Sequence, residues 1–100
     1  MTMLMAQATI PTAAGADYVA AVCTRLAKAE FDTALEDRHG RIALLDGLGT
    51  GTLEALPDRL DIRLEARTEQ GLSVLKFLLG AQIEEAASAE KAEVVWTGHG

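Results

Sequence analysis

The sequence has 100 residues, of which 49% are hydrophobic and 24% are charged, the composition of a globular protein and not of a disordered or fibrous one. A chain of this length fits one domain, predicted over residues 1–100 with an ordered core at about 3–97. The formal net charge of −6 opposes binding to nucleic acids and to anionic membranes. A single cysteine and the lack of an apolar stretch of about 20 residues predict a soluble, cytoplasmic protein.

The first predicted element is a strand at residues 3–10, in which apolar and polar residues alternate from Ala6 to Ile10. Pro11 ends this strand, because proline has no amide hydrogen for a sheet ladder. Thr12 is then placed to cap a helix. The helix is expected to end near Glu30 and carries an apolar stripe of Val19, Val22, Leu26 and Ala29. This stripe predicts that the helix packs on one face of a sheet.

A weakly alternating strand at Phe31–Glu36 and a return strand at Arg41–Leu45 follow the helix, joined by a turn in which Gly40 takes a positive backbone angle. Residues 46–51 then carry three alternating glycines, a composition that also occurs in phosphate-binding loops. Such loops lead directly into a helix N-terminus, whereas here strands are predicted on both sides. The segment is therefore interpreted as a hairpin connection with a bulge.

The clearest pattern of the sequence lies in Arg59–Arg67, where every second residue is apolar and the residues between are charged. Pro57 and Asp58 suit a turn that joins this strand in a hairpin to Thr52–Ala55. The arginines of the strand suggest an anion-binding surface, but the acids between them favour a self-neutralising face exposed to water.

A second helix is predicted from a cap at Thr68 to about Ala87, with an apolar arc wider than one sheet face requires. Either the two helices pack against each other as well as on the sheet, or part of the arc meets another chain. Gln82 lies within this arc, so its amide is expected to be hydrogen-bonded in the core or to face a pocket.

A loop at residues 88–91 and a last strand at 92–97, with Val94 and Trp96 on one face, complete the chain. The predicted order is β-α-β-β-β-β-α-β. Strands in consecutive hairpins with two helices placed among them predict an α+β fold, a two-layer sandwich of an antiparallel sheet with two helices on one face.

The sequence contains no constellation typical of a catalytic or metal site. His39 lies in a predicted turn and His99 in the tail, where neither has the rigid surroundings that a catalytic base needs, and no cysteines stand beside them at zinc-ligand spacing. Adjacent acids in turns or on helices are usually solvated. Cys23 is interpreted as a small core residue, although Arg25 and Lys28 nearby would favour a reactive thiolate.

Six short segments stand in a distinctive order: Ile10-Pro11-Thr12, Tyr18 with Val22-Cys23, Gly40-Arg41-Ile42, Leu53-Glu54-Ala55, Leu60–Ala66 and Val94-Val95-Trp96. In order and spacing they resemble the small bacterial family called domain of unknown function 2218, over almost all of residues 6–97. Members of that family commonly carry a Cys-x-His pattern and a further histidine in the first helix, and a histidine near the end of the second.

In this chain those histidine positions hold Arg25, Lys28 and Gln82, so the resemblance implies no metal or haem site here. It marks Cys23, Arg25, Lys28 and Gln82 as a candidate ligand-binding region between the helices. Some relatives are associated with siderophore-interacting or iron-uptake proteins, which implies a link to iron handling.

Taken with this resemblance, the sequence favours a non-enzymatic domain that binds a small ligand or a protein partner, as an accessory to iron or siderophore handling. One alternative is a homodimer formed through Val74, Phe77 and Leu78 of the second helix. Another is a small enzyme that uses Cys23 or carboxylates. The sequence indicates no particular cofactor.

Overall fold

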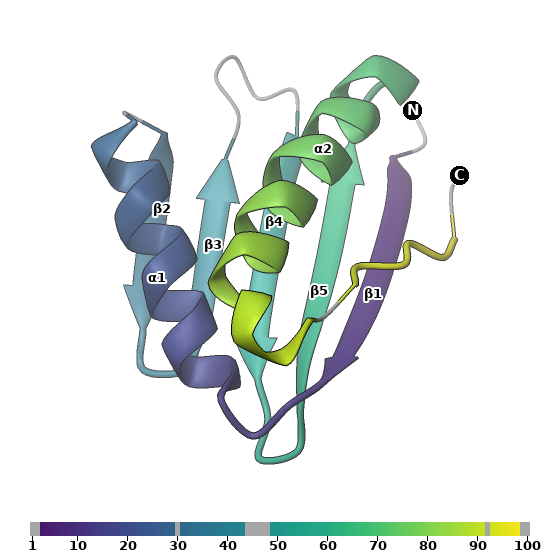
Figure 1. Ribbon diagram of the computed structural model, residues 1–100. Coiled ribbons are helices and arrows are strands. Elements are labelled where there is room, and N and C mark those ends of the chain that lie inside the picture. Colours follow the sequence, from purple (N-terminus) through teal and green to yellow (C-terminus); the bar gives the residue numbers. More distant parts are fainter. Residues whose placement is uncertain (1–2, 30, 44–48, 92, 99–100) are drawn as a thin grey trace.

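The computed structural model describes residues 3–29, 31–43, 49–91 and 93–98, which form a sheet with two helices in front of it (Figure 1). The elements are β1 (Leu4–Pro11), α1 (Gly15–Lys28), β2 (Asp32–Glu36), β3 (His39–Ala43), β4 (Gly49–Ala55), β5 (Arg59–Ala66), α2 (Glu69–Ala86) and the short 3-10 helix η2 (Ser88–Glu90). All neighbouring strands are antiparallel, in the order β1-β5-β4-β3-β2. The predicted α+β class, with both helices on one face of an antiparallel sheet, is confirmed.

Strand β5 shows how the sequence divides the sheet into a covered face and an open face. Leu60, Ile62 and Leu64 are at most 1% exposed, while the charged residues between them are exposed or half-buried. The same alternation along β1 buries Ala6 and Ile10. Burying the apolar side chains against the helices stabilises the fold, and the alternation then directs every charged side chain of β5 to the open face.

The helices begin for different local reasons. Thr68 caps α2 as predicted, because its hydroxyl accepts a hydrogen bond of 3.0 Å from the Gly71 amide. The predicted cap at Thr12 is wrong, since α1 begins only at Gly15 and its N-cap has no side-chain hydrogen bond. Thr12 instead accepts from the Ala14 amide in the approach to the helix, at 3.0 Å.

Gly40 lies within β3 and not in the preceding turn, which corrects its predicted role. The residue of that turn with a positive φ is Asp37, at 51°. A side chain at Gly40 would collide with α1, because a Cβ there would lie 2.7 Å from Cys23 Sγ and 2.9 Å from Val19 Cγ1. Glycine at this position therefore lets α1 pack closely on the sheet. Residues 44–48, with the end of the predicted return strand and the first half of the glycine-rich segment, lie outside the described residues, whereas Gly49 and Gly51 belong to β4.

The last predicted strand, at 92–97, is not a strand in the structure. It is an extended segment joined to β1 by one antiparallel bridge, in which Gln7 and Thr97 exchange two backbone hydrogen bonds of 2.8 Å. The Val94 amide donates instead to the Glu84 carboxylate of α2, at 3.0 Å, so the segment does not continue along β1. Residue 92 and the predicted tail histidine, His99, lie outside the described residues.

Helix α2 packs both on the sheet and against α1, and still leaves apolar surface in contact with water. Its buried side consists of Gly71, Leu72, Leu75, Leu79, Gly80 and Ile83. On its outer side Phe77 is 80% exposed and Val74 is 46% exposed. Among the described residues, neither helix is long and apolar enough to cross a membrane.

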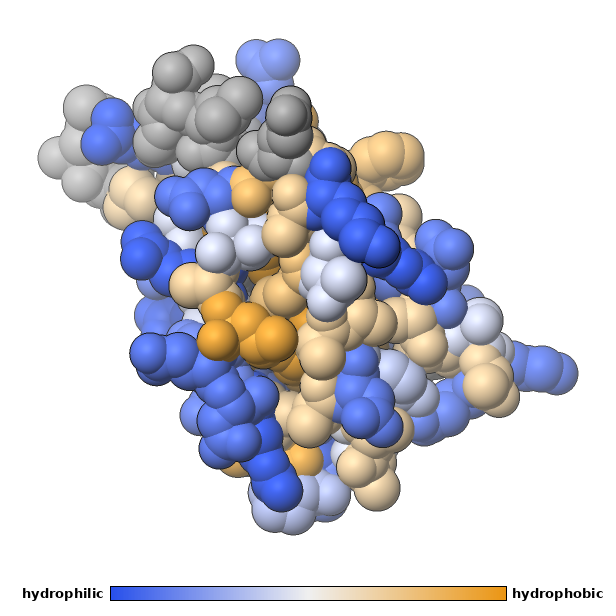
Figure 2. All heavy atoms as spheres, turned by 90° about the vertical axis from the view of Figure 1, so that its left-hand side faces the viewer, coloured by the Kyte–Doolittle hydropathy of each residue, from blue (hydrophilic) through white to orange (hydrophobic). Residues whose placement is uncertain are grey.

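The side of the molecule formed by α1 and β2 is mainly hydrophilic around a central group of apolar side chains (Figure 2). Strand β2 is an edge of the sheet, and its Leu35 is 46% exposed. Both β2 and α2 therefore contribute to the exposed large apolar side chains of the described residues, which are Met3, Leu35, Val74, Phe77 and Val95.

Candidate functional site

The four residues predicted to bind a ligand do not share one surface. Cys23 is 3% exposed and points at Gly40 of β3, within the core cluster. Burial raises the pKa of its thiol, so Cys23 is protonated and unreactive at neutral pH. Lys28 is exposed in the last turn of α1, where its charge suits the helix dipole.

Arg25 and Gln82 lie closer together, at the contact between the helices. Arg25 forms an exposed ion pair of 3.5 Å with Glu85, which stands one turn after Gln82 on the same side of α2. Gln82 is half-buried, and its Oε1 atom is buried with no hydrogen-bond partner among the described residues. Of the four predicted residues, only Arg25 and Gln82 thus lie in the polar region near the contact between the helices, and ligand binding there stays a prediction.

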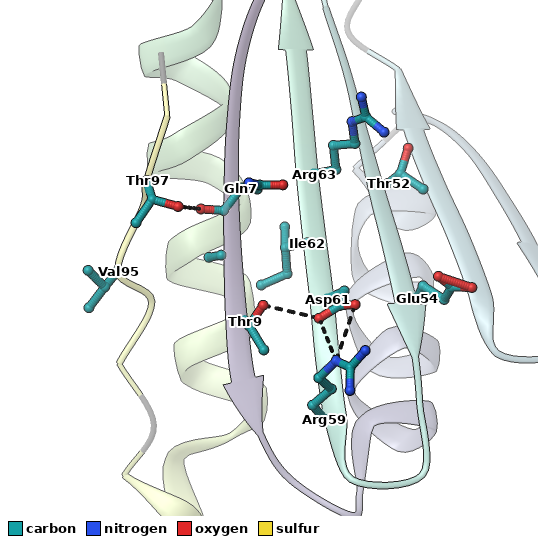
Figure 3. A pocket seen from close by; sticks show the side chains of 11 residues that line it. Gln7, Thr9, Thr52, Glu54, Arg59, Asp61, Ile62, Arg63, Val95 and Thr97 are labelled. Atoms are coloured by element: carbon teal, nitrogen blue, oxygen red, sulfur yellow. Dashed lines mark hydrogen bonds and ion pairs between the residues drawn. The ribbon is translucent and has the colours of Figure 1, made fainter.

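A cavity lies on the open face of the sheet, away from both helices. It has a volume of about 730 Å³ and is lined by side chains of β1, β4 and β5 and by the segment after η2. Two rows of side chains cross the three strands, one of Gln7, Arg63 and Thr52 and the other of Thr9, Asp61 and Glu54. Figure 3 shows these side chains standing above the sheet, with the helices behind it. We call this cavity the sheet concavity.

The charged groups of the sheet concavity largely neutralise one another, as the alternating sequence predicted. Asp61 accepts from the Thr9 hydroxyl at 3.1 Å and pairs with Arg59 at 3.3 Å. Arg63 pairs with Glu65 on its own strand at 3.6 Å. Each of these pairs is partly exposed and contributes little to stability. Asp61 and Arg63 therefore each have an opposite charge within 3.6 Å on the open face.

The segment after η2 forms one wall of the sheet concavity and also covers part of α2. Its side chains alternate: Val94 and Trp96 are half-buried against the core, whereas Val95 and Thr97 line the concavity. The Thr97 hydroxyl donates to the Gln7 carbonyl at 3.2 Å and so ties the wall to β1 (Figure 3). The predicted facing of Val94 and Trp96 is confirmed, although the strand is not.

A polar contact that the sequence did not reveal joins the two ends of the chain. One carboxylate oxygen of Glu90 accepts hydrogen bonds from the buried Thr12 hydroxyl, at 2.7 Å, and from the Tyr18 hydroxyl. Both hydrogen bonds favour the ionised acid, and they hold the pKa of Glu90 below its ordinary value. The same hydrogen bond to Glu90, together with burial, raises the pKa of Tyr18. We call these three residues the Glu90 clasp.

Replacing Glu90 with glutamine is expected to lower the free energy of unfolding at neutral pH, because both hydroxyls lose a charged acceptor. The folded pKa of Glu90 is depressed, so its stabilising effect is complete above the ordinary value of 4.5 and is lost as pH falls through the folded pKa. Urea denaturation at neutral pH and at several pH values below 4.5 measures this effect. The wild type should lose its advantage over the variant in the acid range.

Glu93→Gln is the matched control, since Glu93 is an exposed acid three residues later in the same segment. It is expected to change the free energy of unfolding little at any of these pH values. The claim that the Glu90 clasp stabilises the fold would be contradicted by an equal loss of unfolding free energy in both variants. It would also be contradicted by a Glu90→Gln loss that does not become smaller at acid pH.

The described residues contain no group of three or more histidine, cysteine, aspartate or glutamate side chains placed to hold a metal ion. No curated protein matches the chain. Among solved structures, the fold is similar to the NMR structure of PA4090 from Pseudomonas aeruginosa, with a TM-score of 0.76 and 22% sequence identity over 94% of this chain and 95% of that one. This likeness shows a shared fold.

The sequence also matches the family described as "Uncharacterized protein conserved in bacteria (DUF2218)" over residues 7–97. The match extends from β1, through both helices and every strand described, to the bridge residue Thr97. The resemblance carried by the short segments of the sequence is therefore confirmed, and the chain belongs to the bacterial DUF2218 family.

Proposed function

We propose that the chain is a non-enzymatic, cytoplasmic binding domain and that its ligand is a small polar molecule held in the sheet concavity. The observation that carries the proposal is the concavity itself. Its volume of about 730 Å³ falls in the range of small-molecule sites, about 300–1,000 Å³. Rigid strands present its side chains, and a wall tied to β1 encloses one side.

The lining argues for a ligand of low net charge that carries several hydroxyl, amide or carboxylate groups. The arginines already have acidic neighbours, so a strongly anionic ligand would have to displace Glu65 or Asp61. Hydroxyl and amide groups remain in the two rows, notably the half-buried Thr52 and the amide of Gln7. Such groups donate and accept, which suits a neutral or zwitterionic ligand.

A siderophore or another polar metal chelate fits this description, and we propose an accessory role in iron handling on that basis together with the association implied by the family resemblance. The polar contact between the helices is a second candidate region. The buried Oε1 atom of Gln82, which has no hydrogen-bond partner among the described residues, supports it, because a ligand that donates a hydrogen bond to this atom would offset the cost of burying it.

The proposal is tested by native mass spectrometry of the protein produced in its source bacterium under iron limitation. We expect an adduct that is lost on denaturation. Thr52→Val should weaken binding of the identified ligand by about three- to tenfold, the effect of one hydrogen bond. Thr33→Val is the matched control, because Thr33 is also a half-buried strand threonine but pairs with the buried Ile42 on β3, away from the concavity.

Two results would contradict the assignment of the sheet concavity. One is a spectrum without any adduct. The other is an adduct that survives Thr52→Val and is lost in Gln82→Leu or Arg25→Ala, which would transfer the site to the region between the helices.

A further inference from the structure

The outer side of α2 carries an apolar stripe that no described part of the chain covers. Val74, Phe77 and Ala81 are all exposed, and their spacing of three and four residues keeps them on one side of the helix. In Figure 1 this side of α2 is turned toward the viewer. Leu78, the third contact residue predicted from the sequence, is half-buried and packed against the core. We call Val74, Phe77 and Ala81 the α2 seam.

A hollow of about 240 Å³ lies beside the α2 seam. Gly80, Ala81, Val94 and Trp96 line its apolar part. A Cβ at Gly80 would lie 3.7 Å from Trp96 Nε1, so the segment after η2 extends the apolar surface past the helix. Phe77 protrudes at the edge of the hollow. In a two-fold interface the same patch of each copy faces the other copy. A patch that holds both a protruding side chain and a hollow can therefore fit against itself.

We infer that the α2 seam is the contact surface of a homodimer, in which two copies of α2 pack antiparallel about a two-fold axis. Phe77 of each copy then enters the hollow of the other and lies against the small residues Gly80 and Ala81. This arrangement places the bulkiest exposed apolar side chain of the chain out of water.

The charges that flank the hollow support a second copy of this chain as the occupant. Lys76 and Glu84 both line the hollow, and they stand equally far before and after Gly80. An antiparallel copy centred on Gly80 therefore brings each Lys76 to Glu84 of the partner subunit, and the contact is made twice. Within one chain the two residues are about 12 Å apart along the helix axis, too far to pair.

Leu35 on the edge strand β2 is exposed as well, but this strand has the opposite charge pattern. Antiparallel pairing of two β2 strands centred on Ala34 would set Asp32 against Glu36 of the partner subunit at both ends. Like charges directly opposite each other destabilise a strand pair. The charge pattern therefore favours association through α2 over association through Leu35 and β2.

The inference goes beyond the proposed ligand site, because the sheet concavity and the α2 seam lie on opposite faces of the sheet. Loss of the ligand site would leave the dimer intact, and loss of the dimer would leave the sheet concavity complete in one chain. The two proposals therefore fail separately.

Sedimentation velocity of the full chain, from low to high micromolar concentration, tests the interface. We expect a reversible monomer–dimer equilibrium, since a contact made mainly by one helix from each copy is small. Phe77→Ser should weaken dimerisation about tenfold or more. Leu35→Ser is the matched control, because it removes a comparably apolar, exposed side chain from β2, and it should leave the equilibrium unchanged. Circular dichroism verifies that both variants are folded.

Charge reversal tests the antiparallel arrangement. Lys76→Glu should weaken the dimer by setting two acids against each other. The double variant Lys76→Glu, Glu84→Gln should recover much of the lost affinity, because it removes this repulsion and keeps an acceptor for the Val94 amide. The inference is overturned by a monomer at every concentration, by a Phe77→Ser dimer as tight as the wild type, or by a Leu35→Ser variant that alone loses the dimer. A double variant that does not recover would overturn the two-fold arrangement.

Discussion

Truncating Leu79 to alanine is expected to lower the free energy of unfolding by about 2–5 kcal/mol. Leu79 is 0% exposed, and its Cδ1 atom lies against the backbone of Gly51 on β4. The glycine has no side chain that could move into the void, so we expect a value in the upper half of that range. Because small domains are stable by only about 5–15 kcal/mol, the effect is large enough to measure in any urea titration.

Leu35→Ala provides the control for Leu79→Ala. It makes the same chemical change on β2, where the side chain is 46% exposed, and should alter the free energy of unfolding by no more than about 0.5 kcal/mol. Both variants are compared by urea denaturation followed by circular dichroism. A Leu79→Ala loss no larger than that of Leu35→Ala would show that α2 does not pack on β4 through this residue.

Adding a methyl group to Gly51 is expected to destabilise the protein by about 1–3 kcal/mol, for the opposite reason. The new Cβ would overlap Leu79 Cδ1 and would lie 3.3 Å from Leu64 Cδ2. Both leucines are completely buried, so neither can turn into solvent to make room. Either α2 moves away from the sheet or Leu79 takes a strained rotamer.

The Gly51→Ala effect should change sign when Leu79 is already alanine, because the new methyl group then fills part of the void. The double-mutant cycle is therefore expected to give a coupling larger than the wild-type loss, about 1–3 kcal/mol or somewhat more. Gly80→Ala is the contrasting control: its Cβ would meet Trp96 at 3.7 Å, an ordinary contact, and alanine in a helix interior should stabilise by about 0.5–1 kcal/mol. An equal Gly51→Ala loss in both backgrounds would refute the contact.

Strand β5 was the most predictable part of the sheet, because its signal lies within a single segment. The alternation in Arg59–Arg67 needs no distant partner to be recognised, and the structure buries its apolar face as expected. The same holds for Thr68, whose hydroxyl is used three residues later. Thr12 shows the limit of such reasoning: it is a suitable capping residue, but its hydroxyl is engaged with Glu90 at the other end of the chain.

The candidate sites were less predictable, because they depend on contacts between remote segments. The sheet concavity needs the register of three strands and the bridge at Thr97, neither of which follows from a local pattern. A buried tyrosine usually needs a hydrogen-bond partner, and this was the one sequence signal that could have led to the Glu90 clasp. The surplus of apolar surface on the second helix, by contrast, was visible in the sequence, and Phe77 shows that packing against α1 does not remove it.

The position of β1 beside β5 has a consequence for the order in which the protein assembles during translation. The register pairs Leu4 with Ala66 and Pro11 with Arg59 (Figure 1), so β1 cannot pair until β5 has left the ribosome. At about 5–20 residues per second this takes several seconds, during which the β2–β3 and β3–β4 hairpins can already form. Of the five strands described, β1 is made first, yet it cannot join the sheet before β5 does, and its apolar face stays open to chaperones until then.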